Sequence, residues 1–143
     1  MLAIYAVGVV RVASLPPVPG QNQAIAGWLA AHKLTYGLSG YWMANSITLD
    51  SGGTVRMAPV KGEGTIWPFA WEDDPGWFNP ARHVANFVVL PADGVGPSPG
   101  PGPNPPTLAS AIATFGQPAR AYFLAGYTVL VWPANLLAAM QHQ

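Results

Sequence analysis

The densest group of side chains with chemical potential lies between residues 67 and 77. This stretch combines three of the six tryptophans of the chain with an acidic run; its members are Trp67, Trp71, Glu72, Asp73, Asp74 and Trp77. A sugar can lay its apolar C–H faces on indole rings while its hydroxyl groups donate to carboxylates. These six residues are therefore the candidates for ligand binding, and a glycan is the ligand that they suit.

The same acidic run leaves an enzymatic alternative open. A glycosidase uses two carboxyl groups roughly 5–9.5 Å apart, so Glu72, Asp73 or Asp74 in an aromatic cleft would suit a small carbohydrate-active enzyme. Adjacent carboxylates in a loop are more often simply solvated. A loop tryptophan, in turn, often covers the edge of a core. The sequence thus favours a chain that is not an enzyme on its own, and it assigns no catalytic residue.

Other kinds of chemistry find little support. The chain has no cysteine, which excludes disulfides, thiolate zinc sites and cysteine nucleophiles. Its histidines, His32, His83 and His142, form no metal-binding spacing, and no GxGxxG or GxxxxGK[ST] motif is present. Six basic residues balance six acidic ones without clustering, so nucleic acid is not an expected partner. We expect neither a metal nor a cofactor.

The length of 143 residues suits one domain. Residues 1–20 are an apolar segment with a proline-rich lead-in, and residues 21–143 form the expected domain. The apolar run Met1–Val10 ends at Arg11, short of the roughly 18–20 residues that span a bilayer. No basic residue precedes the run, so it is no signal peptide. It would be a buried strand, the end of a membrane helix or an interfacial anchor.

Hydrophobic periodicity and turn residues predict the elements that position the candidate side chains. The expected helices cover residues 21–32, 41–49, 108–115 and 133–140, and the expected strands cover 34–38, 54–60, 84–90, 119–124 and 127–132. Residues 41–49 also fit a strand, but Ser39 as a cap and the glycines after Asp50 favour a helix. Thr107 is the expected cap of the third helix.

Two regions are expected to lack most regular structure. Residues 61–80 form an aromatic loop, followed by one helical turn at 79–83, and residues 91–106 form an exposed mobile loop rich in proline and glycine. The alternation of helices and strands elsewhere predicts an α/β domain. Its mixed sheet has about five strands with flanking helices, in a two- or three-layer sandwich.

The unit from Leu34 to Pro59 has a turn signal at every joint, and Gly37 and Gly40 would suit an anion cradle or tight packing. Packing is favoured, because no complete phosphate-binding motif is present. This unit contains a set of residues that we expect to be structural: Tyr36, Gly37, Gly40, Tyr41, Trp42 and Asn45. On these residues the chain resembles the C-terminal soluble region of bacterial membrane proteins of the glycosyltransferase 39 type, relatives of the dolichyl-phosphate-mannose protein mannosyltransferases.

The resemblance implies an accessory, non-catalytic domain on the extracytoplasmic face of a membrane. Such a domain would bind or orient a glycan, an acceptor or a membrane-protein partner, while catalysis belongs to a membrane-embedded region that these residues lack. It would make Met1–Val10 the end of a membrane helix and Leu15–Gly20 the lead-out from it. Only 8% of the residues are charged, against about 25% in typical soluble domains. A purely structural interaction module remains a further alternative.

Overall fold

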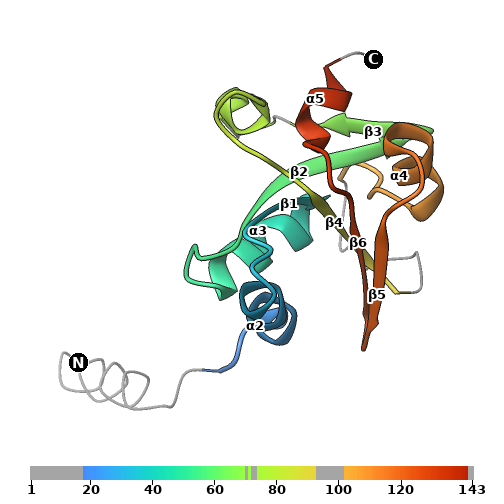
Figure 1. The fold of residues 1–143 in the computed structure, drawn as a ribbon. Coiled ribbons are helices and arrows are strands. Elements are labelled where there is room, and N and C mark those ends of the chain that lie inside the picture. The colour runs from blue at the N-terminus through green and yellow to red at the C-terminus, as the bar shows by residue number, and fades with distance from the viewer. Residues whose placement is uncertain (1–17, 70, 72–73, 93–101, 142–143) are drawn as a thin grey trace, which may run out of the picture.

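The fold is built on one mixed six-stranded sheet. The structure is a computed structural model that describes residues 18–69, 71, 74–92 and 102–141. The strand order is β3-β2-β1-β4-β6-β5 (Figure 1). The strands are β1 (Tyr36–Gly40), β2 (Arg56–Glu63), β3 (Thr65–Pro68), β4 (Phe87–Pro91), β5 (Arg120–Leu124) and β6 (Tyr127–Val131). Strand β1 runs parallel to β2 and β4, and the other pairs are antiparallel. The predicted α/β class with a mixed sheet is confirmed.

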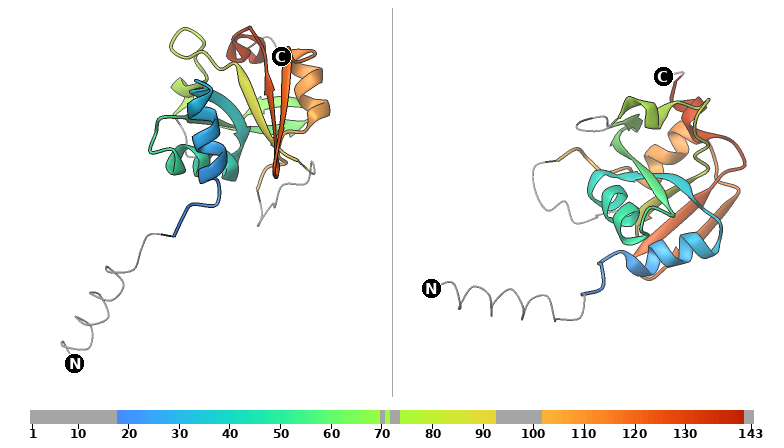
Figure 2. Two further views of the ribbon diagram at one scale, coloured as in Figure 1. Left: turned by 60° about the horizontal axis from the view of Figure 1, so that its bottom comes forward. Right: turned by 90° about the vertical axis from the view of Figure 1, so that its left-hand side faces the viewer.

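Helices cover both faces of this sheet. They are α2 (Gln23–Ala31), α3 (Tyr41–Asp50), α4 (Leu108–Phe115), α5 (Leu136–Met140) and the 3-10 helix η1 (Pro75–Phe78). Figure 2 shows α2 and α3, in blue and teal, on one side of the sheet and α4 and α5, in orange and red, on the other. Of the two predicted sandwiches, the three-layer arrangement is therefore the one observed.

The central strand β4 explains why its sequence is apolar without alternation. Phe87 and Val89 pack into the core beneath α2 and α3, whereas Val88 and Leu90 pack into the core beneath α4 and α5. All four side chains are buried. A strand covered on both faces needs apolar residues at every position, which is what the sequence shows.

The expected loop over residues 61–80 is the main error of the sequence analysis. Strand β2 continues to Glu63, and the chain turns at Gly64, whose φ of +78° suits glycine, into the antiparallel strand β3. Ile66 anchors this strand because its side chain is fully buried. The expected helical turn at 79–83 is a hydrogen-bonded turn in which Arg82 and His83 both donate to the Asn79 carbonyl.

The predicted helix over residues 41–49 is confirmed as α3, but its expected cap is wrong. Ser39 is fully buried within β1 and donates its hydroxyl to the Val89 carbonyl over 2.8 Å. Gly40 is the N-cap residue, and no side chain caps the first turn. By contrast, Thr107 caps α4 as predicted and forms a reciprocal capping box with Ser110.

Two expectations fall largely on residues outside the described part of the chain. The apolar run Met1–Val10 lies there, as do residues 93–101 of the expected proline-rich loop. The end of that loop is described: the Gly62 amide donates to the Asn104 carbonyl over 2.9 Å, so this part lies against β2. No helix within the described ranges has the length and apolar character needed to cross a bilayer.

Candidate functional site

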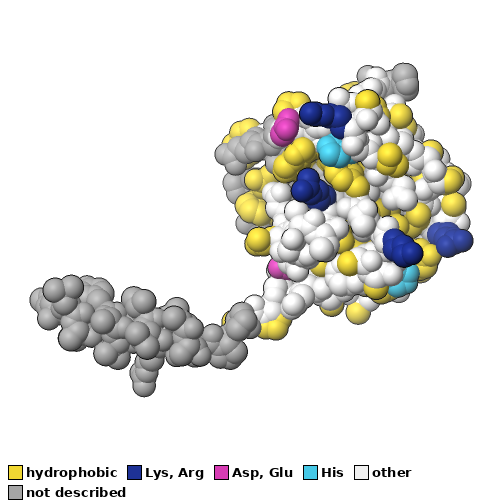
Figure 3. Space-filling view, turned by 60° about the vertical axis from the view of Figure 1, so that its left-hand side comes forward, with side chains coloured by type: hydrophobic (Ala, Val, Ile, Leu, Met, Phe, Trp, Pro, Cys, Tyr) yellow, Lys and Arg dark blue, Asp and Glu magenta, His cyan; other side chains and the backbone are white. Residues whose placement is uncertain are grey.

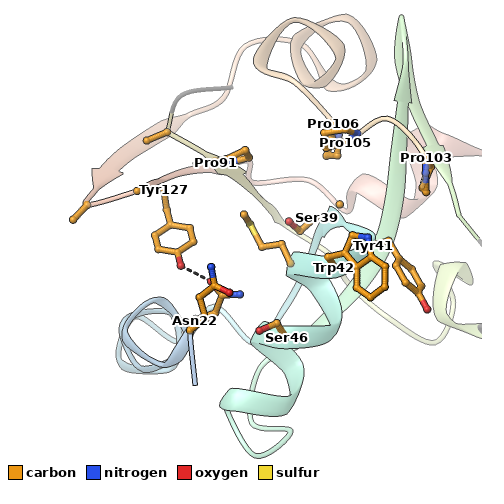
Figure 4. A pocket seen from close by; sticks show the side chains of 16 residues that line it. Asn22, Ser39, Tyr41, Trp42, Ser46, Pro91, Pro103, Pro105, Pro106 and Tyr127 are labelled. Atoms are coloured by element: carbon orange, nitrogen blue, oxygen red, sulfur yellow. Dashed lines mark hydrogen bonds between the residues drawn. The ribbon is translucent and has the colours of Figure 1, made fainter. Parts of the chain in front are cut away.

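A crevice opens where the parallel strands β1 and β4 end. The chain leaves β1 into α3 on one face of the sheet, and it leaves β4 toward α4 on the opposite face. Open α/β sheets bind ligands at such a switch point, outside the carboxyl ends of the strands. The crevice has a volume of about 680 Å³ (Figure 4), within the range of roughly 300–1,000 Å³ common for ligand pockets.

The lining of the crevice combines apolar surface with polar side chains that carry no charge. Among the described residues that line it there is no Asp, Glu, Lys, Arg or His. Its hydrogen-bonding side chains are those of Gln21, Asn22, Ser39, Tyr41, Trp42, Ser46 and Tyr127, and prolines at 91, 103, 105 and 106 supply much of the apolar surface. Figure 4 shows Pro103, Pro105 and Pro106 across the crevice from the first turn of α3. This surface suits a neutral ligand with several hydroxyl groups.

Asn22 and Tyr127 form a polar pair at one side of the crevice. The Tyr127 hydroxyl donates to the Asn22 side-chain oxygen, as the dashed line in Figure 4 marks. The Asn22 backbone amide donates to the Asp50 carboxylate over 2.9 Å, which holds the residue in place. Burial, and secondarily the charge of Asp50, raises the pKa of Tyr127, so its phenol stays protonated. The Asn22 side chain is only 8% exposed, and no described residue accepts from its amide nitrogen.

The Asn22 amide nitrogen, which has no acceptor among the described residues, is placed to donate to a ligand in the crevice. A buried polar donor left without an acceptor costs about 1–3 kcal/mol, and such groups are uncommon in native structures. A ligand hydroxyl within the crevice would satisfy the Asn22 donors. The uncapped first turn of α3 adds backbone N–H groups at the same place.

Four aromatic side chains extend from the crevice along the surface, and we call Trp42, Tyr41, Phe69 and Trp71 the aromatic row. Successive ring centroids lie 5.1, 5.5 and 6.3 Å apart, in edge-to-face contacts. Trp42 and Trp71 are 54% and 66% exposed. The Trp42 ring is therefore accessible to a ligand.

The four described members of the set predicted to bind ligand lie in three different surroundings. Trp71 belongs to the aromatic row, whereas Asp74 and Trp77 line a different cavity. Trp67 lies on β3 opposite Lys61 and is 37% exposed. Glu72 and Asp73 lie outside the described residues.

The sequence analysis missed the polar pair at the crevice. Asn22 and Tyr127 are 105 positions apart in the chain, and no local motif joins them. Only the junction at Gly40 and Tyr41, where a strand passes directly into a helix, signals the position of the crevice.

The remaining residues that carry the family resemblance have mixed roles. Tyr36 stacks on His83 with ring centroids 4.6 Å apart, and its hydroxyl donates to the Trp77 carbonyl over 2.8 Å. A Cβ atom on Gly37 would lie 2.4 Å from the Phe87 ring, so packing explains this glycine. Asn45 lines the cavity that Asp74 and Trp77 share.

Within the described residues, no group of three or more His, Asp or Glu side chains is arranged to hold a metal ion. Comparisons of the chain with protein-family models, with curated proteins and with solved structures give no match.

Proposed function

We propose that this chain is an accessory, non-catalytic domain that binds a neutral saccharide in the crevice at the carboxyl ends of β1 and β4. One observation carries the proposal: a crevice of about 680 Å³ combines exposed aromatic rings with uncharged hydrogen-bonding groups. Aromatic faces bind the C–H surface of a sugar ring, and amide and hydroxyl groups orient its hydroxyls.

The aromatic row extends this site beyond one sugar. It continues from Trp42 at the crevice through Phe69 to Trp71, so an oligosaccharide would have further contacts outside the crevice. A charged ligand would find no charged side chain among the described lining residues. The site therefore favours a neutral chain of sugars over a sugar phosphate or a sugar acid.

The enzymatic alternative has less support. Of its three carboxylates, the described one is Asp74, which accepts a hydrogen bond from the Gly76 amide over 2.8 Å and so caps η1. This capping role explains Asp74 without chemistry. Nor does Asp74 line the crevice at the ends of β1 and β4.

The experiment is to titrate the chain with neutral oligosaccharides and to measure binding by calorimetry. Trp42→Ala is expected to weaken binding by a factor of roughly 5–30, the equivalent of 1–2 kcal/mol, because it removes the aromatic surface of the crevice. Trp67→Ala is the matched control, since this exposed tryptophan lies on β3, outside the crevice. Equal affinities for wild type and Trp42→Ala, or no binding by the wild type, would contradict the proposal.

We further propose that the domain lies on the extracytoplasmic side of a membrane, beside a glycosyltransferase-like protein. The resemblance around Tyr41 and Trp42 and the charge content of 8% support this location. The coding sequence immediately upstream tests it directly. Membrane-spanning segments in the same reading frame are the expected result, and a gene that encodes these residues alone would remove the main support.

A further inference from the structure

A second cavity lies at the other end of the strands, away from the crevice. It opens where the parallel strands β1 and β2 begin, and it has a volume of about 630 Å³. Its charged and aromatic lining residues are Tyr36, Arg56, Asp74, Trp77, Arg82 and His83. Figure 3 shows basic, acidic and histidine side chains gathered among apolar ones on one face of the molecule. We call this cavity the basic cavity.

The cations of the basic cavity outnumber its described anions. Two arginines line it, while Asp74 is the acidic residue among its described lining. The Asp74 carboxylate already accepts from the Gly76 amide over 2.8 Å. Neither guanidinium group forms an ion pair or a hydrogen bond with a described residue. Lys61, by contrast, forms an ion pair with Glu63. The arginine donors therefore have no described acceptor at this cavity.

Aromatic side chains hold the wall of the basic cavity in place. The Tyr36 and His83 rings stack at an interplanar angle of 8°, and the Tyr36 hydroxyl donates to the Trp77 carbonyl. Burial raises the pKa of Tyr36 to about 12. The phenol is therefore neutral at physiological pH and does not offset the arginine charges.

Arg82 lies at the cavity wall beside Gly76 and Asp74. One of its guanidinium nitrogens lies 3.2 Å from the position that a Cβ atom on Gly76 would take. The absence of a side chain at Gly76 thus leaves room for Arg82 beside η1. The Arg56 guanidinium, from the start of β2, lies close enough to Tyr36 for its charge to act on the phenol.

We propose that the basic cavity binds an organic phosphate or carboxylate, with its anionic group held by Arg56 and Arg82 and its apolar part against Trp77 and His83. The guanidinium group matches the planar, bidentate geometry that phosphates and carboxylates accept. The anion can belong to a free small molecule or to a lipid headgroup, since both present the same chemistry. This inference does not rest on the saccharide site, which lies at the other end of the strands.

The test is a calorimetric titration with phenyl phosphate, with benzyl alcohol as the uncharged probe. Phenyl phosphate is expected to bind and benzyl alcohol is not. Arg56→Ala and Arg82→Ala are each expected to weaken binding roughly tenfold or more, because each removes charge-assisted hydrogen bonds. Asp74→Asn is expected to strengthen binding, because it removes a negative charge from the wall and keeps an oxygen that can cap η1.

Arg120→Ala is the matched control, since it removes one exposed arginine on β5, outside the basic cavity. Thermal unfolding of each variant checks that the fold is intact. Equal loss of affinity in Arg120→Ala and Arg82→Ala would show attraction by net charge alone and would overturn the proposal. The proposal would also be overturned if the wild type bound neither phenyl phosphate nor the anionic lipid vesicles described next.

The lipid arm uses co-sedimentation with phosphatidylcholine vesicles that contain or lack phosphatidylglycerol. Binding to the anionic vesicles that is lost in Arg56→Ala and Arg82→Ala, but retained in Arg120→Ala, would identify a lipid headgroup as the source of the anion. Binding of phenyl phosphate without vesicle binding would identify a free small molecule. Failure of both arms rejects the site and leaves the saccharide proposal untouched.

Discussion

Two glycines show how differently the same residue is used in this chain. Gly37 lies in the middle of the sheet, where a Cβ atom would come within 2.4 to 2.7 Å of three atoms of the Phe87 ring. Phe87 is itself fully buried beneath α2 and α3, so a shift of its ring would disturb the core around it. Gly27 lies on the exposed side of α2, and no atom would lie within 4 Å of its Cβ. The first glycine is required by packing, and the second is not.

This contrast predicts opposite effects of the same substitution. Gly37→Ala should lower the free energy of unfolding by about 1–3 kcal/mol, because it overpacks the core against Phe87. Gly27→Ala should raise it by roughly 0.5–1 kcal/mol, because alanine loses less conformational freedom in a helix. Equilibrium urea denaturation measures both. A neutral Gly37→Ala would mean that the Phe87 ring can shift and that packing does not explain this glycine.

At the scale of elements, local signals were sufficient for α4 and for the hairpin of β5 and β6. Thr107 with Ser110 three residues later marks the start of α4, and the predicted end at Phe115 is also observed. The hairpin of β5 and β6 follows from Gly126, whose φ of +83° forms the turn. The strand β3 was missed because its one fully buried residue, Ile66, follows Gly64 and is itself followed by a stretch rich in proline and tryptophan that is typical of a loop.

The candidate site was less predictable than the elements, because it is made by tertiary contacts. The sequence places three tryptophans within eleven positions, yet the structure separates Trp67, Trp71 and Trp77 into different surroundings. Conversely, Tyr127 and Asn22 meet only because β6 lies next to β4 and α2 lies over that side of the sheet. Spacing along the chain predicts contacts within a helix or a hairpin, but not contacts across a sheet.

At the scale of the whole molecule, the two cavities lie at opposite ends of the same strands. Gly40, at the end of β1, lines the uncharged crevice, and Tyr36, at its start, lines the basic cavity. Four residue steps of a strand separate these residues by about 13 Å. Helix α3 contributes to both cavities as well, through Trp42 at one end and Leu49 at the other. The elements that join the cavities are thus regular, and β1 pairs with a strand on either side.

Such rigid elements lead us to expect independent binding at the two sites. Coupling requires an element with two alternative arrangements that each ligand favours differently, whereas β1 is hydrogen-bonded to a strand on either side and α3 is one continuous helix. Saturation with phenyl phosphate should therefore change the affinity for the saccharide by less than about twofold. Saturation with the saccharide should likewise change the affinity for phenyl phosphate by less than about twofold. Trp42→Ala should likewise spare phosphate binding, and Arg82→Ala should spare saccharide binding. Calorimetry with one ligand held at saturation measures this. A larger effect, equal in both directions as linkage demands, would show that the sheet transmits binding from one end to the other.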